Sequence, residues 1–96
     1  MGNDLTDRKV RIGDEYDQRV WTALRDVLSE LGLVVNSEEW GVGGSQELIT
    51  IVVSAGSKTL TIESETYLGV SVAGEPELVA EVAARVAGRL GKAGPS

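Results

Sequence analysis

A change in hydrophobic period along the chain is the feature that most constrains its fold. Between residues 33 and 73 apolar side chains recur at every second position, among many Val, Ile and Thr residues, which is typical of β-strands. On both sides of this segment apolar residues recur every three or four positions, as on one face of an α-helix. A length of 96 residues suits a single domain. We therefore expect a two-layer α+β domain with the order α-β-β-β-β-α, in which an antiparallel meander sheet carries both helices on one face.

The first helix is expected over residues 14–31. Asp14 is the expected N-cap, and Gly32 has the position of a C′ glycine that ends a helix in the left-handed conformation. Leu33 would then return its side chain to the helix. The apolar stripe of this helix consists of Tyr16, Val20, Leu24, Val27, Leu28 and Leu31.

The second helix is expected to begin at Glu75-Pro76, because proline at the first helical position loses no hydrogen bond. Its expected end is Gly91. Its apolar stripe consists of Val79, Val82, Val86 and Leu90.

These limits define the expected domain organisation. Residues 14–91 would form the single α+β domain, between a flexible N-terminal segment of residues 1–13 and a flexible C-terminal tail of residues 92–96. Val10 and Ile12 alternate with charged residues, which leaves a short edge strand in the N-terminal segment open as an alternative.

Gly56-Ser57 is the clearest turn signal in the strand region. A two-residue turn here pairs Val53 with Leu60 and Ile51 with Ile62, so that all four apolar side chains share one face of the sheet. We expect this face to rest on the helices.

Two further turns are expected in the meander. Gly44-Ser45 would place Trp40 opposite Ile49, with a bulge at Gly41 or Gly43 left open. A turn at Ser64-Glu65-Thr66 would place Ile62 opposite Leu68.

The sequence contains neither Cys nor His. This excludes thiol nucleophiles, imidazole acid–base catalysis, disulfides and nearly all zinc sites. The remaining candidates for a catalytic or ligand-binding site have simpler structural interpretations. Trp40 to Ser45 is glycine-rich but precedes a strand instead of the helix that a phosphate loop requires. Lys58 at a hairpin turn is an ordinary surface lysine, and Glu63 with Glu65, about 7 Å apart on one face, are solvated acids. We expect no enzymatic activity, no cofactor and no metal.

The formal net charge is −6, without a basic cluster. Binding to nucleic acid or to an anionic membrane surface requires clustered Lys and Arg, so we expect neither. The sequence has no apolar run of about 20 residues and no signal-peptide pattern after the first residue, so the expected location is the cytoplasm. An acidic protein of this kind suits a protein partner with a basic surface.

The face of the sheet opposite the helices is the expected partner-binding surface, for another protein or a second copy of the chain. Val52 and Tyr67 would be its apolar anchors, Glu63 and Glu65 would select a basic rim, and Gly69 would leave a notch. Thr50, Glu63 and Tyr67 would form one cross-strand row, and Val52, Thr61 and Gly69 the next. The alternative is that β-propensity alone places Val, Thr and Tyr here. The complete expected surface consists of Leu48, Thr50, Val52, Thr61, Glu63, Glu65, Tyr67 and Gly69.

These observations predict a non-catalytic, acidic protein-interaction module, of the kind found among regulators, immunity proteins, small chaperones and adaptors. A small-ligand-binding domain is the alternative. The small residues Ala80, Ala84 and Gly88 on the second helix would permit close helix contact in a homodimer, although the helix propensity of alanine also explains two of them.

Overall fold

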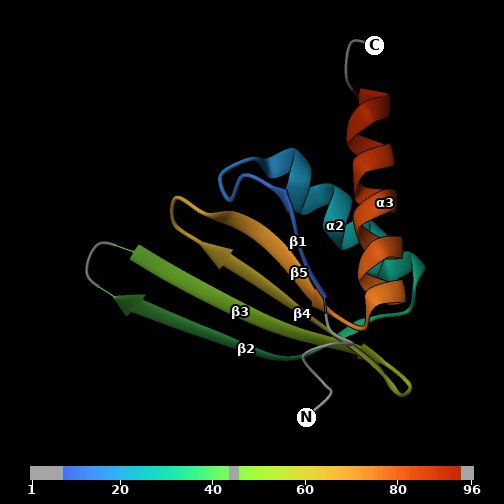
Figure 1. Cartoon of the computed structure of the whole chain (residues 1–96), viewed down its shortest axis with the longest axis horizontal. Coiled ribbons are helices and arrows are strands. Elements are labelled where there is room, and N and C mark those ends of the chain that lie inside the picture. Colours follow the sequence, from blue (N-terminus) through green and yellow to red (C-terminus); the bar gives the residue numbers. More distant parts are fainter. Residues whose placement is uncertain (1–7, 44–45, 94–96) are drawn as a thin grey trace.

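The computed structural model describes residues 8–43 and 46–93. The strands of this part form one sheet in the order β1-β5-β4-β3-β2, with every neighbouring pair antiparallel (Figure 1). The predicted α+β class and the antiparallel meander, from β2 to β5, are confirmed. In chain order the elements are β1 (Arg8–Gly13), α2 (Gln18–Glu30), β2 (Val34–Gly43), β3 (Gln46–Ala55), β4 (Lys58–Glu65), β5 (Gly69–Gly74) and α3 (Pro76–Ala93).

The expected flexible segment was wrong for residues 8–13, which form the edge strand β1 beside β5. Val10 lies opposite Val72, and both Val10 and Ile12 pack against the core. The strand forms because Val10 and Ile12 can pack against the core beside β5, which lies near the other end of the sequence. Residues 1–7 lie outside the described residues.

The Gly56-Ser57 turn is confirmed. Val53 lies opposite Leu60, and Ile51 lies opposite Ile62, as expected. Gly56 has a φ of 63°, in the left-handed region that glycine enters without a Cβ penalty.

The register expected between β4 and β5 was wrong by four residues. Ile62 lies opposite Val72 instead of Leu68, and the strands are joined by residues 66–68. At this turn the N–H of Leu68 donates to the carbonyl oxygen of Glu65 at 3.1 Å, and Leu68 is 57% exposed. A shift of four leaves every even-numbered residue on the same face, so the apolar pattern fits either register.

The register between β2 and β3 agrees with the prediction for the outer part of the hairpin. Trp40 lies opposite Ile49, and the pairing continues without a shift to Gly43. Of the two alternatives left open, the strand therefore has no bulge at Gly41 or Gly43. The expected turn residues, Gly44-Ser45, lie outside the described residues.

The bulge of β2 lies instead at Asn36, between Val35 and Ser37. The Asn36 Nδ2 donates to Ser54 Oγ on β3 at 2.7 Å, and this bond holds the extra residue in place. The bulge keeps Val35 and Glu38 on the same side of the sheet although they are three positions apart.

Helix α2 begins at Gln18, four residues later than expected, and its N-cap is Asp17 instead of Asp14. The carboxylate of Asp17 accepts the backbone N–H of Arg19 at 2.9 Å. Asp14 instead accepts the N–H of Tyr16 in the preceding turn. Tyr16 therefore precedes the helix and is 76% exposed, so its expected place in the core stripe was wrong.

The predicted end of α2 is confirmed. Gly32 has a φ of 73°, and its N–H donates to the carbonyl oxygen of Ser29 at 3.1 Å. The N–H of Leu33 donates to the carbonyl oxygen of Leu28 at 2.9 Å, and the Leu33 side chain is buried. These two bonds are the Schellman motif. The chain thus turns from α2 into β2 within a few residues.

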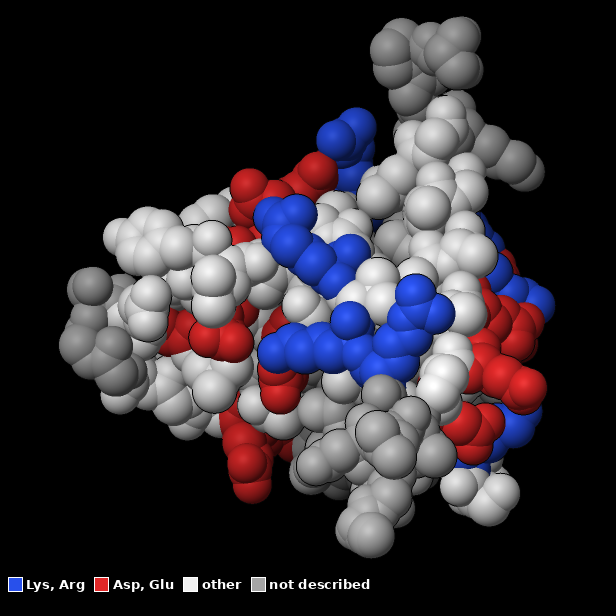
Figure 2. All heavy atoms as spheres, viewed as in Figure 1, with Lys and Arg blue, Asp and Glu red and all other residues white. Residues whose placement is uncertain are grey.

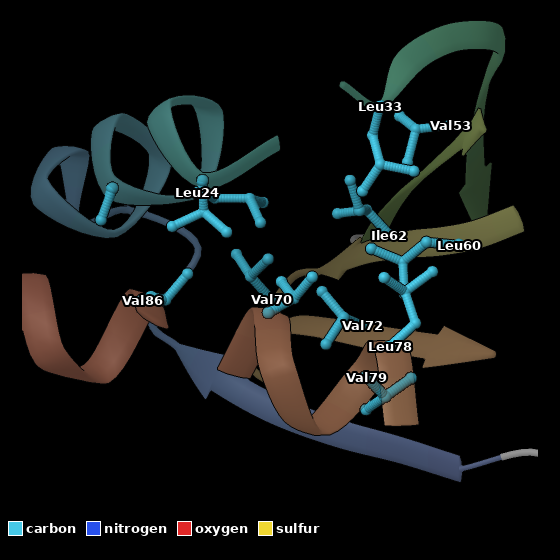
Figure 3. Packing of buried hydrophobic residues seen from close by; sticks show 13 residues of the cluster. Leu24, Leu33, Val53, Leu60, Ile62, Val70, Val72, Leu78, Val79 and Val86 are labelled. Atoms are coloured by element: carbon cyan, nitrogen blue, oxygen red, sulfur yellow. The ribbon is translucent and has the colours of Figure 1, made fainter. Parts of the chain in front are cut away.

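The core lies between the helices and one face of the sheet, where side chains of α2, α3 and the strands point toward one another (Figure 3). Helix α3 begins at Pro76 as expected and continues to Ala93, beyond the expected end at Gly91. The fully buried side chains are Leu24, Leu60, Ile62, Val27, Val53, Val70, Val72, Val79, Val82 and Val86.

The two helices leave part of this face uncovered. Helix α3 packs against β1, β5 and β4, and also against α2. Side chains of α2 reach Ile51, Val53 and Ile62 on the neighbouring strands. The outer part of the β2–β3 hairpin extends away from both helices (Figure 1). The fold therefore offers two sheet surfaces to a partner: the side opposite the helices, and the uncovered part of the helix side.

Candidate functional site

The side opposite the helices carries six of the eight residues expected to bind a partner. They form three consecutive cross-strand pairs of β3 and β4. Directly opposed residues point to the same side of a sheet, so these six side chains form one surface. The pairs are Leu48 with Glu65, Thr50 with Glu63, and Val52 with Thr61.

The other two expected residues do not complete the predicted rows. Tyr67 lies in the β4–β5 turn with a φ of 72°, so the row of Thr50 and Glu63 continues to Ser71 instead. The backbone N–H of Tyr67 donates to Glu15 Oε2 at 2.8 Å, in the turn between β1 and α2. Its expected role beside Glu63 therefore rested on the wrong register.

Gly69 does not leave a notch. It is buried, and a Cβ placed on it would overlap the carbonyl oxygen of Gly13 and lie 2.6 Å from Arg11 Nε. Arg11 Nε also donates to the carbonyl oxygen of Leu68 at 2.9 Å. Strand β1, which the sequence analysis treated as a flexible segment, thus fills this part of the surface.

Strand β1 also changes the charge of this surface. Lys9 Nζ lies 2.6 Å from Glu63 Oε1, and this hydrogen bond raises the pKa of Lys9. Glu63 is therefore neutralised by a cation of its own chain and is less available to select a basic partner. Basic and acidic side chains lie next to each other on the face seen in Figure 2.

The uncovered part of the helix side carries an apolar surface that the sequence analysis did not single out. We call it the β2–β3 platform. Three of its side chains are strongly exposed: Val35 is 62% exposed, Trp40 64% and Val42 61%. The half-buried Ile49 and Ile51 continue it toward the core. The platform consists of Val35, Glu38, Trp40 and Val42 of β2 with Ile49 and Ile51 of β3.

Helix α2 forms a wall along the platform. Trp21 and Leu28 of this helix line a hollow of about 170 Å³ together with Val35 and Ile51. Trp21 also lines a second hollow of about 240 Å³, which reaches Ile49. The indole Nε1 of Trp21 donates to the carbonyl oxygen of Glu15 at 2.9 Å, which fixes the ring at the junction of the two hollows. Wall and platform together form a groove.

Acidic side chains accompany this groove. Glu38 lies within the platform, opposite Ile51, and Glu15 and Glu47 line the hollow of about 240 Å³. Among the described residues, no salt bridge involves Glu38. One cation, Arg25 of α2, lines the hollow of about 170 Å³. The groove therefore combines exposed apolar surface with three carboxylates and one guanidinium.

A hollow of about 410 Å³, larger than the two beside the platform, lies between α2 and the end of α3. Its charged residues Arg19, Asp26 and Arg89 already have partners within the chain, and Arg19 pairs with Asp17 at 3.0 Å. Arg89 pairs with Asp26 at 3.6 Å and with Glu30, and Arg85 pairs with Glu30 at 3.2 Å. These ion pairs hold the two helices together, and this hollow is a weaker candidate for a partner.

The expected stripe of Ala80, Ala84 and Gly88 is exposed on α3. A Cβ at Gly88 would meet no described residue within 4 Å, and small side chains alone define no site. Within residues 8–43 and 46–93, no cluster of three or more acidic side chains could hold a metal ion.

No helix in the described part of the chain is long and apolar enough to span a membrane. Comparisons of the chain with protein-family models, curated proteins and solved structures find no match. The function is therefore inferred from surface chemistry.

Proposed function

We propose that the protein is a non-catalytic protein-interaction module and that it binds its partner on the β2–β3 platform. The observation that carries this proposal is the exposure of Trp40, whose indole is 64% exposed on the same side of the sheet as the core. Large aromatic side chains are enriched at the centres of protein interfaces. The adjacent Val35 and Val42 extend the apolar surface along the strand.

The platform supports a protein partner better than a small ligand. Its hollow beside Trp21 measures about 240 Å³, and pockets for small molecules usually measure about 300–1,000 Å³. Trp40, the largest side chain of the platform, is 64% exposed and lines neither of the two hollows beside α2. Regulators, immunity proteins, small chaperones and adaptors remain the classes that this proposal covers, with the cytoplasm as the proposed location.

Strand β2 contains matched positions for a test. Val34 and Val35 are 63% and 62% exposed, but they point to opposite sides of the sheet, because they lie opposite Ser54 and Val53. A photoreactive amino acid would be placed at Val34, Val35, Val42 or Val52, and the protein would be irradiated inside the cells that make it. A discrete adduct from Val35 and Val42, but not from Val34, is the expected result.

Adducts from Val34 and Val52 alone would move the interface to the side opposite the helices, where the sequence analysis placed it. That surface would be tested further by the substitution Val52→Lys, which should then abolish the adduct from Val34 without unfolding the domain. Absence of adducts at all four positions would contradict the interaction-module proposal.

The proposal includes no nucleic-acid partner. The net charge of −6 opposes binding to phosphate, and Lys9 of the basic strand β1 is already paired with Glu63. We expect no electrophoretic mobility shift of DNA or RNA at micromolar protein and about 150 mM salt, where non-specific binders already respond. A shift under these conditions would contradict the proposal.

A further inference from the structure

The width of the sheet indicates what kind of element the platform can hold. Five strands spaced about 4.8 Å apart span about 19 Å between the outer strand axes. Packed helices lie about 8–10 Å apart, so each covers about two strands. Two helices thus cover about four of the five strands and leave the edge strand β2 uncovered. Its exposed Val35, Trp40 and Val42 form a strip beside α2 that one more helix could occupy.

Strand β2 is an edge strand, and its edge is protected against pairing with another strand. The bulge at Asn36, held by its bond to Ser54, interrupts the regular ladder. Glu38 points to the helix side and Glu39 to the opposite side, so a charged side chain stands on each face of the strand. A bulge and inward-pointing charges are devices that natural proteins use to prevent edge pairing. The helix side of β2 exposes Trp40 two residues from Glu38.

The described helices of this chain do not suit the platform as partners from a second copy. Both already bury their apolar stripes in their own core, through Leu24 and Val27 of α2 and Val79 and Val82 of α3. Neither of these two helices of a second copy is therefore a suitable occupant.

The charge of the groove specifies the occupant further. Glu38 lies among apolar side chains of the platform, and Glu15 and Glu47 lie at the adjoining hollow. Against these three carboxylates stands one cation, Arg25 of α2, so the groove is net negative. A helix placed there would set its flanking residues near these carboxylates. Lys or Arg at such positions gains attraction, whereas Asp or Glu is repelled.

We propose that the β2–β3 platform binds one amphipathic helix of another protein, which lies beside α2 with its apolar stripe on Val35, Trp40 and Ile49 and with basic residues flanking that stripe near Glu38. This inference rests on the proposed function and specifies the partner of the same site. In the sequence of the partner helix, the apolar residues of this stripe would recur at positions i, i+3 or i+4, and i+7.

The test uses three synthetic peptides of about 14 residues, or four helical turns. The first carries leucines at the helical spacing and flanking lysines. The second has the lysines replaced by glutamates, and the third has the composition of the first with leucine and lysine alternating, as in a strand. Binding is measured in about 150 mM salt by the fluorescence of Trp40 in a Trp21→Phe variant. Amide chemical shifts of the unmodified protein provide a second measurement that does not depend on this variant.

The basic helical peptide should shift the emission of Trp40 to shorter wavelengths and perturb amides of α2, β2 and β3. The acidic and the alternating peptide should bind at least about tenfold more weakly, a difference of about 1.4 kcal/mol. Glu38→Lys should weaken binding of the basic peptide and strengthen binding of the acidic one. Glu39→Lys is the matched control, because it makes the same charge change on the opposite side of the strand.

Equal effects of Glu38→Lys and Glu39→Lys would overturn the inference, because they would show attraction to net charge alone. Preferential binding of the alternating peptide would also overturn it, in favour of strand pairing. If no peptide perturbs the platform, the helix inference fails, while the photochemical experiment at Val35 and Val42 decides the proposed function independently.

Discussion

The side chain of Arg11 lies directly against the α-carbon of Gly69. A Cβ at this glycine would lie 2.6 Å from Arg11 Nε, and it would overlap the carbonyl oxygen of Gly13. The guanidinium of Arg11 reaches past the glycine and donates to the carbonyl oxygen of Leu68 at 2.9 Å. Gly69 also has a φ of 93°, in the region that favours glycine. The edge strand and the β4–β5 turn therefore depend on the absence of a side chain at this position.

Gly69→Ala should destabilise the domain by more than about 1 kcal/mol, because both the backbone conformation and the space for a Cβ are unsuitable. Gly41→Ala is the control, since a Cβ at Gly41 meets nothing within 4 Å. Urea denaturation of the two variants measures the difference. Equal stability of both variants would show that β1 does not pack against Gly69.

Tyr67→Asn should stabilise the domain by about 1 kcal/mol. Tyr67 has a φ of 72°, which costs a tyrosine more than an asparagine, and its side chain is 75% exposed, so little burial is lost. The backbone N–H that donates to Glu15 is retained. Thermal denaturation tests this expectation. A clear loss of stability would mean that the tyrosine ring makes stabilising contacts despite its exposure.

Ile62→Ala should destabilise the domain by about 2–5 kcal/mol, as a large-to-small change in a core position that is 1% exposed. Its neighbour Glu63 points to the other side and pairs with Lys9 on the surface. Glu63→Ala should therefore cost less than about 1 kcal/mol. Urea denaturation compares the two. A larger effect at Glu63 would place the wrong face of β4 in the core.

The start of α2 should show a pH dependence through Asp17. The Arg19 guanidinium and backbone N–H bind the carboxylate and lower the pKa of Asp17 in the folded state. A lowered folded-state pKa means that the carboxylate stabilises the fold above the ordinary aspartate pKa and that this contribution is lost as the pH falls through the lowered value. The melting temperature of the wild type should therefore exceed that of Asp17→Asn near neutral pH, and the difference should shrink below about pH 4. A difference independent of pH would contradict this assignment.

Local signals in the sequence predicted the parts of the fold that depend on a few neighbouring residues. Gly56 fixes a two-residue turn, and the register of β3 and β4 follows from it. Gly32 likewise predicts the end of α2. The β4–β5 turn has no such signal, because its left-handed residue is Tyr67 and not a glycine. The alternation of apolar and polar residues fits any two registers that differ by an even number of residues. The predicted and the observed register differ by four residues.

The remaining differences arise from contacts between distant parts of the chain. Strand β1 pairs with β5, which lies near the other end of the sequence. The six residues of β1 are mostly charged or small and do not indicate this partner strand. The platform was missed for a related reason. The sequence predicted Trp40 opposite Ile49, on the helix side. It could not show how far the helices extend over the sheet, because that depends on the packing of α2 against α3.

The position of β1 beside β5 has a consequence for how the chain folds. Strands β2 to β5 are joined by short connections and can pair locally, whereas the contact of Arg11 with Leu68 joins residues 57 positions apart. Closing so long a loop carries an entropic cost that is recovered only after β5 is in place, so β1 is expected to dock late in folding. Helix α3 packs on β1 as well as on β5. Strands β2 to β5 can therefore pair one after another, but β1 and α3 complete the fold together because each packs against the other. We expect β1 and α3 to form one cooperative unit.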